Sequence, residues 1–104
     1  MKNYAFGVDV GGTLCKLGLF ETDGTLLERW EIPTDTRDGG TRILPDVAAS
    51  IQERQTKLSE NSVLGVGVGV PSPMTQDGVA IKSVNLGWEN YPVAAELSRL
   101  TGLP

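Results

Sequence analysis

The stretch YAFGVDVGGT, residues 4–13, decides how the rest of the chain is interpreted. Its apolar side chains alternate with small or polar ones, and this period of two predicts a buried strand that ends at Asp9 or Val10. Gly11, Gly12 and Thr13 then predict a tight turn. Two glycines at a strand end let backbone N–H groups converge on one point, and such a concavity binds anionic oxygens.

Two side chains add to the chemistry of this turn. Thr13 brings a hydroxyl donor, and Asp9 brings a carboxylate that could hold Mg²⁺ or its waters, as phosphoryl transfer requires. The same residues also suit an ordinary hairpin turn in which Asp9 bonds its own backbone. The turn joins two apolar strands, and a second strand end rich in Gly and Pro follows later. This context favours phosphate binding.

Working outward, residues 15–20 predict a second strand, and Asp23-Gly24 predicts a hairpin turn into a third strand over residues 26–32. Leu26, Trp30 and Ile32 are expected on one face of that strand, which completes an antiparallel meander. Residues 33–40 read as a loop. Residues 41–58 predict an amphipathic helix with Pro45 in its first turn, with its buried face formed by Ile43, Val47, Ile51, the stem of Arg54, and Leu58.

Residues 64–70 predict a fourth strand with Leu64, Val66, Val68 and Val70 on one face and glycines on the other. A small hairpin over residues 74–81, a loop over 85–88 and a helix over 91–101 follow, with Gly102 as a left-handed C-terminal residue. A strand-helix-strand connection is right-handed and makes the fourth strand parallel to the first. The fold class is therefore α/β, a mixed sheet with a three-strand meander.

Composition excludes several classes of protein. A chain of 104 residues forms one small domain, and its net charge of −4 without a basic run argues against a nucleic-acid partner. No apolar stretch approaches the roughly 20 residues that span a membrane. With one cysteine, Cys15, and no histidine, neither an intrachain disulfide nor a zinc site is expected. No signal peptide is evident, so a cytoplasmic location is expected.

Three segments together resemble the ROK family of repressors, open reading frames and sugar kinases. They are FGVDVGGT at 6–13, GVGVGVPSP at 65–73, and VNLGW at 84–88 followed by a helix that ends in TGLP. The resemblance covers essentially the whole chain in order and spacing. It implies an actin-like, ribonuclease-H-like fold in which two such domains close over ATP and a sugar.

The resemblance also implies roles for individual residues. It places the terminal phosphates of ATP and Mg²⁺ beside Asp9, Gly11, Gly12 and Thr13, and the sugar beside Asn85 and the loop of Pro71, Ser72 and Pro73. The chain departs from the family pattern at two positions. Ser72 stands where members often have Gly, which affects the loop shape and sugar preference, and Leu14 stands where Lys is frequent.

The implied activity is ATP-dependent phosphorylation of a hexose, with glucose first and fructose or an N-acetylhexosamine as alternatives. A sugar-responsive repressor would need a helix-turn-helix before Tyr4, where no room is left. A truncated, non-catalytic sugar-sensing or interaction module is a third class. Residues 1–104 would be the amino-terminal part of the kinase, with the second lobe and the general-base Asp expected beyond Pro104. The isolated chain is therefore expected to show no turnover, and its open sheet edge predicts self-association.

Overall fold

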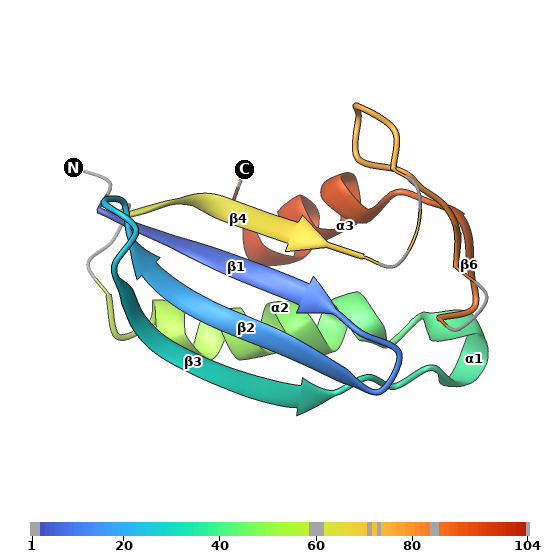
Figure 1. Cartoon of the computed structure of the whole chain (residues 1–104), viewed down its shortest axis with the longest axis horizontal. Coiled ribbons are helices and arrows are strands. Elements are labelled where there is room, and N and C mark those ends of the chain that lie inside the picture. The colour runs from blue at the N-terminus through green and yellow to red at the C-terminus, as the bar shows by residue number, and fades with distance from the viewer. Residues whose placement is uncertain (1–2, 59–61, 71, 73, 84–85, 104) are drawn as a thin grey trace.

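A computed structural model describes residues 3–58, 62–70, 72, 74–83 and 86–103 of the chain (Figure 1). Within them a four-stranded sheet lies against two helices, and a two-stranded ribbon stands at one end. The elements in chain order are β1 (Tyr4–Val10), β2 (Leu14–Glu21), β3 (Leu26–Pro33), α1 (Arg37–Gly40), α2 (Ile43–Gln55), β4 (Val63–Gly69), β5 (Ala80–Ser83), β6 (Trp88–Tyr91) and α3 (Val93–Thr101).

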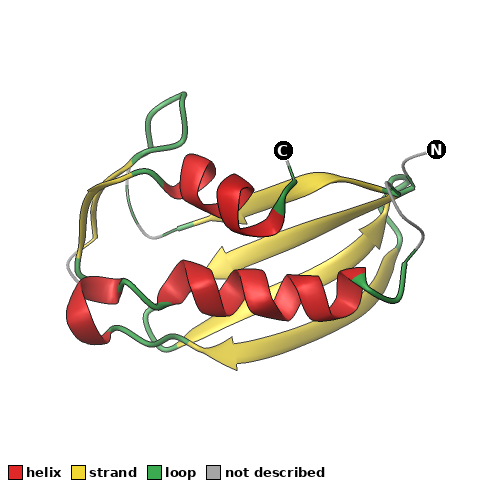
Figure 2. Ribbon diagram, turned by 180° about the vertical axis from the view of Figure 1, so that it is seen from behind, coloured by secondary structure: helices red, strands yellow, loops and turns green. Residues whose placement is uncertain are grey.

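The main sheet has the strand order β3-β2-β1-β4. β1 pairs antiparallel with β2 and parallel with β4, and β2 pairs antiparallel with β3. This confirms the predicted meander and the parallel fourth strand. Figure 2 shows α2 and α3 side by side on one face of the sheet. Because β1 and β4 are parallel, their carboxyl ends meet at the same edge of the sheet.

The hydrophobic core fills the space between this helical face, called here the inner face, and the helices. The alternation in β1 and β2 sends one set of side chains inward, and α2 covers them with a stripe of apolar residues. Buried inner-face residues of the first two strands are Phe6, Val8, Val10, Cys15, Leu17 and Leu19. The opposite, outer face is not covered by any helix of the described part of the chain, and Gly7, Gly18 and Gly67 lie on it.

Trp30 anchors α2 to β3. Its indole Nε1 donates to Ser50 Oγ at 2.7 Å, and the Arg54 guanidinium lies 4.0 Å from the centre of its ring. Phe6 meets the same ring edge-on, with the centroids 6.3 Å apart. The arginine stem was predicted on the buried side of the helix, and the stacking over Trp30 explains how it lies there with its charge satisfied.

Two β-bulges correct the predicted faces. An extra residue in β4 opposite the Tyr4/Ala5 junction places Val63 in the core and leaves Leu64 52% exposed, so Leu64 does not share a face with Val66. A second shift, between Leu19 and Phe20, pairs Phe20 with Leu26. Leu26 therefore lies on the outer face rather than beside Trp30. A single extra residue reverses every later side chain of a strand.

The second half of the chain contains a strand that was not predicted, where a loop was expected to end at Trp88 and a helix to begin at Tyr91. Trp88–Tyr91 forms β6, which pairs antiparallel with β5. α3 begins at Val93, two residues later than predicted, with Pro92 at its N-cap. Gly102 closes the helix with φ of 74°, as predicted. None of the helices in the described residues has the length and apolar character needed to cross a membrane.

The ribbon of β5 and β6 is joined to the main domain through Trp88. The Trp88 indole Nε1 donates to Gly40 O at 3.0 Å, and the ring stacks on Tyr91 at a centroid distance of 4.5 Å. α1 is one irregular turn, since Asp38 and Gly39 have left-handed backbone angles. A side chain at Gly40 would collide with the Leu86 carbonyl, so the close approach of these two segments requires glycine.

Candidate functional site

The candidate site is built on the turn between β1 and β2. Gly11 N–H donates to Leu14 O at 2.9 Å, which closes a tight loop around Gly12 and Thr13. A Cβ at position 11 would lie only 2.7 Å from the Leu14 carbonyl oxygen. Glycine is therefore required at position 11 by the close approach of the backbone. The sequence prediction of a tight turn at these residues is confirmed.

The donors of this turn divide into used and unused groups. In the described part of the chain, the amides of Gly12 and Thr13 and the Thr13 hydroxyl have no hydrogen-bond partner, and both residues are exposed. The turn carbonyls are engaged instead, since Thr34 Oγ1 donates to Gly11 O at 2.8 Å and Thr34 N–H donates to Thr13 O at 2.9 Å. The turn thus presents N–H donors outward, the arrangement that receives an anion.

Asp9 lies next to the turn, at the end of β1. Its register partners are Lys16 on β2 and Gly69 on β4. The side chains of Asp9 and Lys16 are exposed on the outer face, and neither side chain forms an ion pair or hydrogen bond with the described residues. The Asp9 carboxylate lies 4.0 Å from where a Cβ of Gly69 would stand, so the missing side chain leaves room above β4.

The outer face is hollowed beside this carboxylate. An open depression of about 470 Å³ runs over β1, β2 and β4, and Asp9, Lys16 and Arg29 contribute its charged side chains. Its floor is formed by Gly7, Gly18, Gly67 and Gly69, with Phe20 and Leu26 at one side. A mainly apolar floor with a few charges at its rim is typical of a ligand site or of a docking surface.

The sugar side of the site is described only in part. Pro71, Pro73 and Asn85 lie outside the described residues, so their predicted roles stay predictions. Ser72 follows the end of β4, and its hydroxyl accepts a hydrogen bond from Lys82 N–H at 3.1 Å. This bond ties the loop after β4 to β5. Ser72 is therefore placed near the carboxyl end of β4, at the same edge of the sheet as the Gly11–Thr13 turn.

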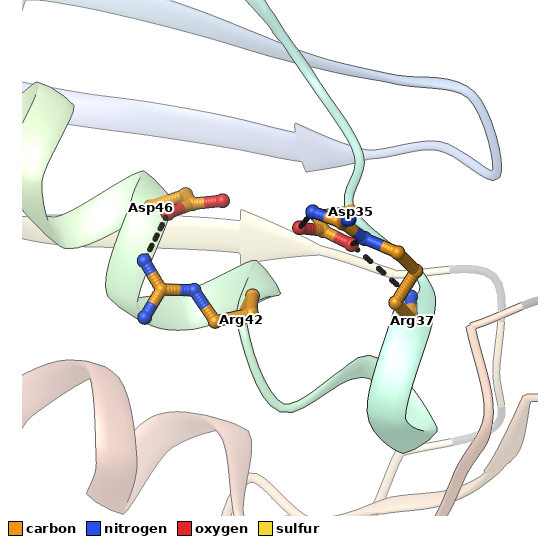
Figure 3. A network of polar contacts seen from close by, with 4 residues as sticks. All are labelled: Asp35, Arg37, Arg42 and Asp46. Atoms are coloured by element: carbon orange, nitrogen blue, oxygen red, sulfur yellow. Dashed lines mark hydrogen bonds and ion pairs between the residues drawn. The ribbon is translucent and has the colours of Figure 1, made fainter.

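Two ion pairs lie between the end of β3 and the first turn of α2 (Figure 3). Asp35 binds Arg37 through Oδ2 at 2.8 Å, and Asp46 accepts from Arg42 at 3.4 Å. Hydrogen bonds from Arg37 lower the pKa of Asp35 to about 2. Each of these carboxylates is thus paired with a cation, which reduces the repulsion that an incoming anion would meet at this end of the sheet.

Buried between the turn and the core is Cys15, whose thiol was predicted to be a packing residue. It is 1% exposed, and its Sγ lies 3.3 Å from Thr34 Oγ1. Burial raises the pKa of the thiol, which keeps it protonated and unreactive. Across the described residues no group of three or more Cys, Asp and Glu side chains is close enough together to hold a metal ion.

The backbone resembles solved kinases over nearly its full length. A ROK family glucokinase from Streptomyces griseus, in a structure with glucose and AMPPNP, superposes with a TM-score of 0.81 at 22% identity, covering 97% of this chain and 31% of that one. The fold is thus of the actin-like, ribonuclease-H-like ATPase class. The ROK family sequence profile matches residues 5–104, and the chain belongs to that family.

Curated relatives give the same picture. A glucokinase of Halalkalibacterium halodurans is 37% identical over 101 residues, covering 94% of this chain and 31% of that protein. An N-acetyl-D-glucosamine kinase of Citrobacter koseri is 32% identical over 96 residues, covering 89% of this chain and 30% of that protein. The chain therefore spans about a third of the length of the sugar kinases it matches.

The sequence analysis missed Thr34, which holds the turn between β1 and β2 through two hydrogen bonds. Thr34 follows the predicted third strand and was assigned to a polar loop, yet both its N–H and its hydroxyl bond the turn. The pairing of Leu14 with Pro33 brings Thr34 to this place. The signal that could have identified it is a threonine directly after the third strand. Only the strand register shows that this threonine lies opposite the turn.

Proposed function

We propose that this chain supplies the phosphate-binding part, and some of the sugar-binding part, of an ATP-dependent hexose kinase with glucose as its substrate. One observation carries the proposal: the amides of Gly12 and Thr13, which have no partner among the described residues, lie in the turn that follows the strand end bearing the exposed Asp9. Because the chain spans about a third of its relatives, the second lobe and the general base belong to the remainder of a full-length kinase. A cytoplasmic location is part of the proposal.

The residues present fit a magnesium nucleotide. Mg²⁺ keeps several waters and is bound in kinases through one or two carboxylates together with phosphate oxygens, so a single exposed aspartate suffices on the protein side. The space above Gly69 gives the Asp9 carboxylate an open approach. When bound, Mg²⁺ neutralises charge on the phosphates. Asp9 would hold the ion or its waters, and the amides of Gly12 and Thr13 would hold phosphate oxygens.

These roles concern binding and positioning. Two backbone N–H groups held in this turn would provide hydrogen bonds without reorganisation when a phosphoryl group moves, and the Thr13 hydroxyl would add a third donor. Lys16 contributes positive charge on the same face as Asp9. Proton removal from the sugar hydroxyl lies outside these residues. The proposal therefore keeps the expectation that the chain alone shows no turnover of ATP and glucose.

Binding of MgATP tests the proposal. Isothermal titration of the chain with MgATP should give a heat of binding that disappears when a chelator removes Mg²⁺. Asp9→Asn should abolish this dependence of binding on Mg²⁺. Asp77→Asn is the matched control, because Asp77 is an exposed turn carboxylate on the loop between β4 and β5 and should leave binding unchanged. Equal loss in both variants, or no binding to the parent chain at millimolar nucleotide, would contradict the proposal.

Sugar choice is tested separately. Glucose and N-acetylglucosamine are titrated in the presence of MgATP, with glucose expected to bind more tightly. A preference for the acetylated sugar would favour the second candidate, a hexosamine kinase, which the similarity to the Citrobacter koseri enzyme supports. Sugar binding without any nucleotide binding would instead favour a non-catalytic sensing module.

A further inference from the structure

Thr34 makes three contacts at the back of the phosphate turn. Its hydroxyl donates to Gly11 O at 2.8 Å, its N–H donates to Thr13 O at 2.9 Å, and its Oγ1 lies 3.3 Å from Cys15 Sγ. The first two contacts hold carbonyl oxygens on either side of Gly12. A residue that comes from the end of β3 thus grips the turn between β1 and β2 at two points.

Because the peptide group is planar, the hydrogen bond from Thr34 to the Gly11 carbonyl also orients the next N–H group. In a trans peptide the C=O of one residue and the N–H of the next point opposite ways. The Thr34 hydroxyl holds the carbonyl of Gly11, so it also fixes where the N–H of Gly12 points. A Gly-Gly peptide can rotate at little cost because neither residue has a Cβ. Rotation of this peptide would present a carbonyl oxygen, which repels a phosphate, in place of the N–H.

The contact with Cys15 completes a chain of hydrogen bonds. A threonine hydroxyl has a single proton, and here that proton is directed to Gly11 O. The 3.3 Å contact therefore uses the Cys15 thiol as donor and Thr34 Oγ1 as acceptor. The protonated, buried state of Cys15 suits this role. Thr34 is held from the core side while it holds the turn on the other, so its rotamer is fixed.

We propose that Thr34 is a positioning residue of the phosphate turn: its hydroxyl, backed by the Cys15 thiol, aims the Gly12 N–H at the anion. The inference rests on the proposed function for the identity of the ligand, whereas the two hydrogen bonds from Thr34 to the turn do not depend on any ligand. Thr34 does not touch the nucleotide. Its effect is on the direction of a donor and therefore on phosphate affinity.

The test uses amide NMR on the whole chain, with sodium tripolyphosphate as the probe. Thr34→Val removes the hydroxyl and retains the N–H, whereas Thr34→Ser retains both. In the ligand-free chain, Thr34→Val should broaden the Gly12 and Thr13 amide signals through peptide rotation. Its tripolyphosphate affinity should fall about 3- to 10-fold, as expected for one hydrogen bond, while Thr34→Ser should stay within about twofold.

Two controls separate positioning from general stability. Ser50→Ala removes the hydrogen bond to Trp30 on the inner face, so it should lower stability in urea without changing tripolyphosphate affinity. Thr34→Ala, measured in the same way, replaces Thr34→Val if the valine variant does not fold. Loss of affinity in Ser50→Ala equal to that in Thr34→Val would assign the effect to stability and overturn the inference.

The outcomes distinguish this inference from the proposed function. If the parent chain shows no tripolyphosphate shifts at Gly12 and Thr13, the proposed phosphate site of this chain fails, and the broadening of the ligand-free turn still decides the role of Thr34. If the turn amides of the Thr34→Val chain give sharp, unshifted signals, the proposed role of Thr34 is wrong whatever the ligand does. Broadened signals with rescue by Thr34→Ser support it.

Discussion

The two faces of the main sheet differ in what their side chains do. On the inner face β1 presents Phe6, Val8 and Val10 to the helices, and all three are at most 5% exposed. On the outer face the same strand presents Gly7 and Asp9, and the neighbouring strands add glycines around an open hollow. One strand therefore supplies the core with one set of side chains and the candidate site with the other.

This division follows from the period of two in a β-strand. Residues one apart point to opposite faces, so an exposed aspartate, proposed to bind a cation, can stand between two valines that bury apolar surface. Packing should then depend on the inner set and ligand binding on the outer set. Each prediction below tests whether the two faces are independent in this way.

The largest effect is expected for a leucine on the inner face. Leu17→Ala removes a side chain that is 2% exposed and should lower the free energy of unfolding by about 2–5 kcal/mol. Leu26→Ala, on the outer face and 45% exposed, should cost about 1 kcal/mol or less. Urea unfolding followed by circular dichroism measures both. Similar losses for the two variants would show that something covers the outer face in solution.

A glycine pair tests the turn against the hollow. Gly11→Ala places a Cβ against the Leu14 carbonyl and should lower the free energy of unfolding by about 1–3 kcal/mol. The same variant should lose MgATP binding. Gly67→Ala adds a methyl where no heavy atom lies within 4 Å, and it should be neutral or stabilising by up to about 1 kcal/mol. Urea unfolding and calorimetric titration give the two readouts. A destabilised Gly67→Ala variant would contradict the open outer face.

The edge of the sheet gives a third, smaller effect. β4 ends the strand order on one side, and an open apolar edge invites pairing with a second copy of the chain. Self-association should appear in sedimentation velocity as concentration rises, and Leu64→Lys should suppress it. Leu27→Lys makes the same change on β3, the opposite edge strand, and should have little effect. A parent chain that stays monomeric at every concentration would remove this expectation.

The smallest effect concerns acid. Arg37 holds the pKa of Asp35 at about 2, below the ordinary carboxyl value of 3.8. The stabilisation from this pair is therefore present above about pH 4 and is lost as pH falls toward about 2. Arg37 is 84% exposed, so screening keeps the effect small. Asp35→Asn should flatten the slope of unfolding free energy against pH in that window. Arg37→Ala should flatten it less, because the backbone N–H of residue 37 still donates to Asp35 Oδ1.

Much of the fold could be predicted because its signals are local. The alternation over residues 4–10 gave β1 with the observed ends, and the apolar spacing after Pro45 gave α2. The predicted faces of Leu26 and Leu64 were wrong because Leu26 directly precedes a bulge and Leu64 forms one, and a bulge is a property of strand pairing. β6 was missed because it has only four residues and its middle residues, Glu89 and Asn90, are polar.

The candidate site shows the same limit. Asp9, Gly12 and Thr13 could be selected from the sequence because a glycine pair after a buried strand has a direct meaning for the backbone. Thr34 could not, since its position beside the turn depends on the register between β2 and β3. The sequence identifies the groups proposed to bind the ligand, whereas the residue that holds them in place comes from elsewhere in the chain.

The position of Trp88 allows intrinsic fluorescence to follow unfolding of the ribbon formed by β5 and β6. The chain has two tryptophans, and they sit in unlike surroundings. Trp88 is stacked on Tyr91 where the ribbon meets the domain, while Trp30 lies beneath a guanidinium on the main sheet. Intrinsic fluorescence from a Trp30→Phe chain would follow only the ribbon. Detachment of that ribbon could thus be timed separately from melting of the sheet, with no dye attached.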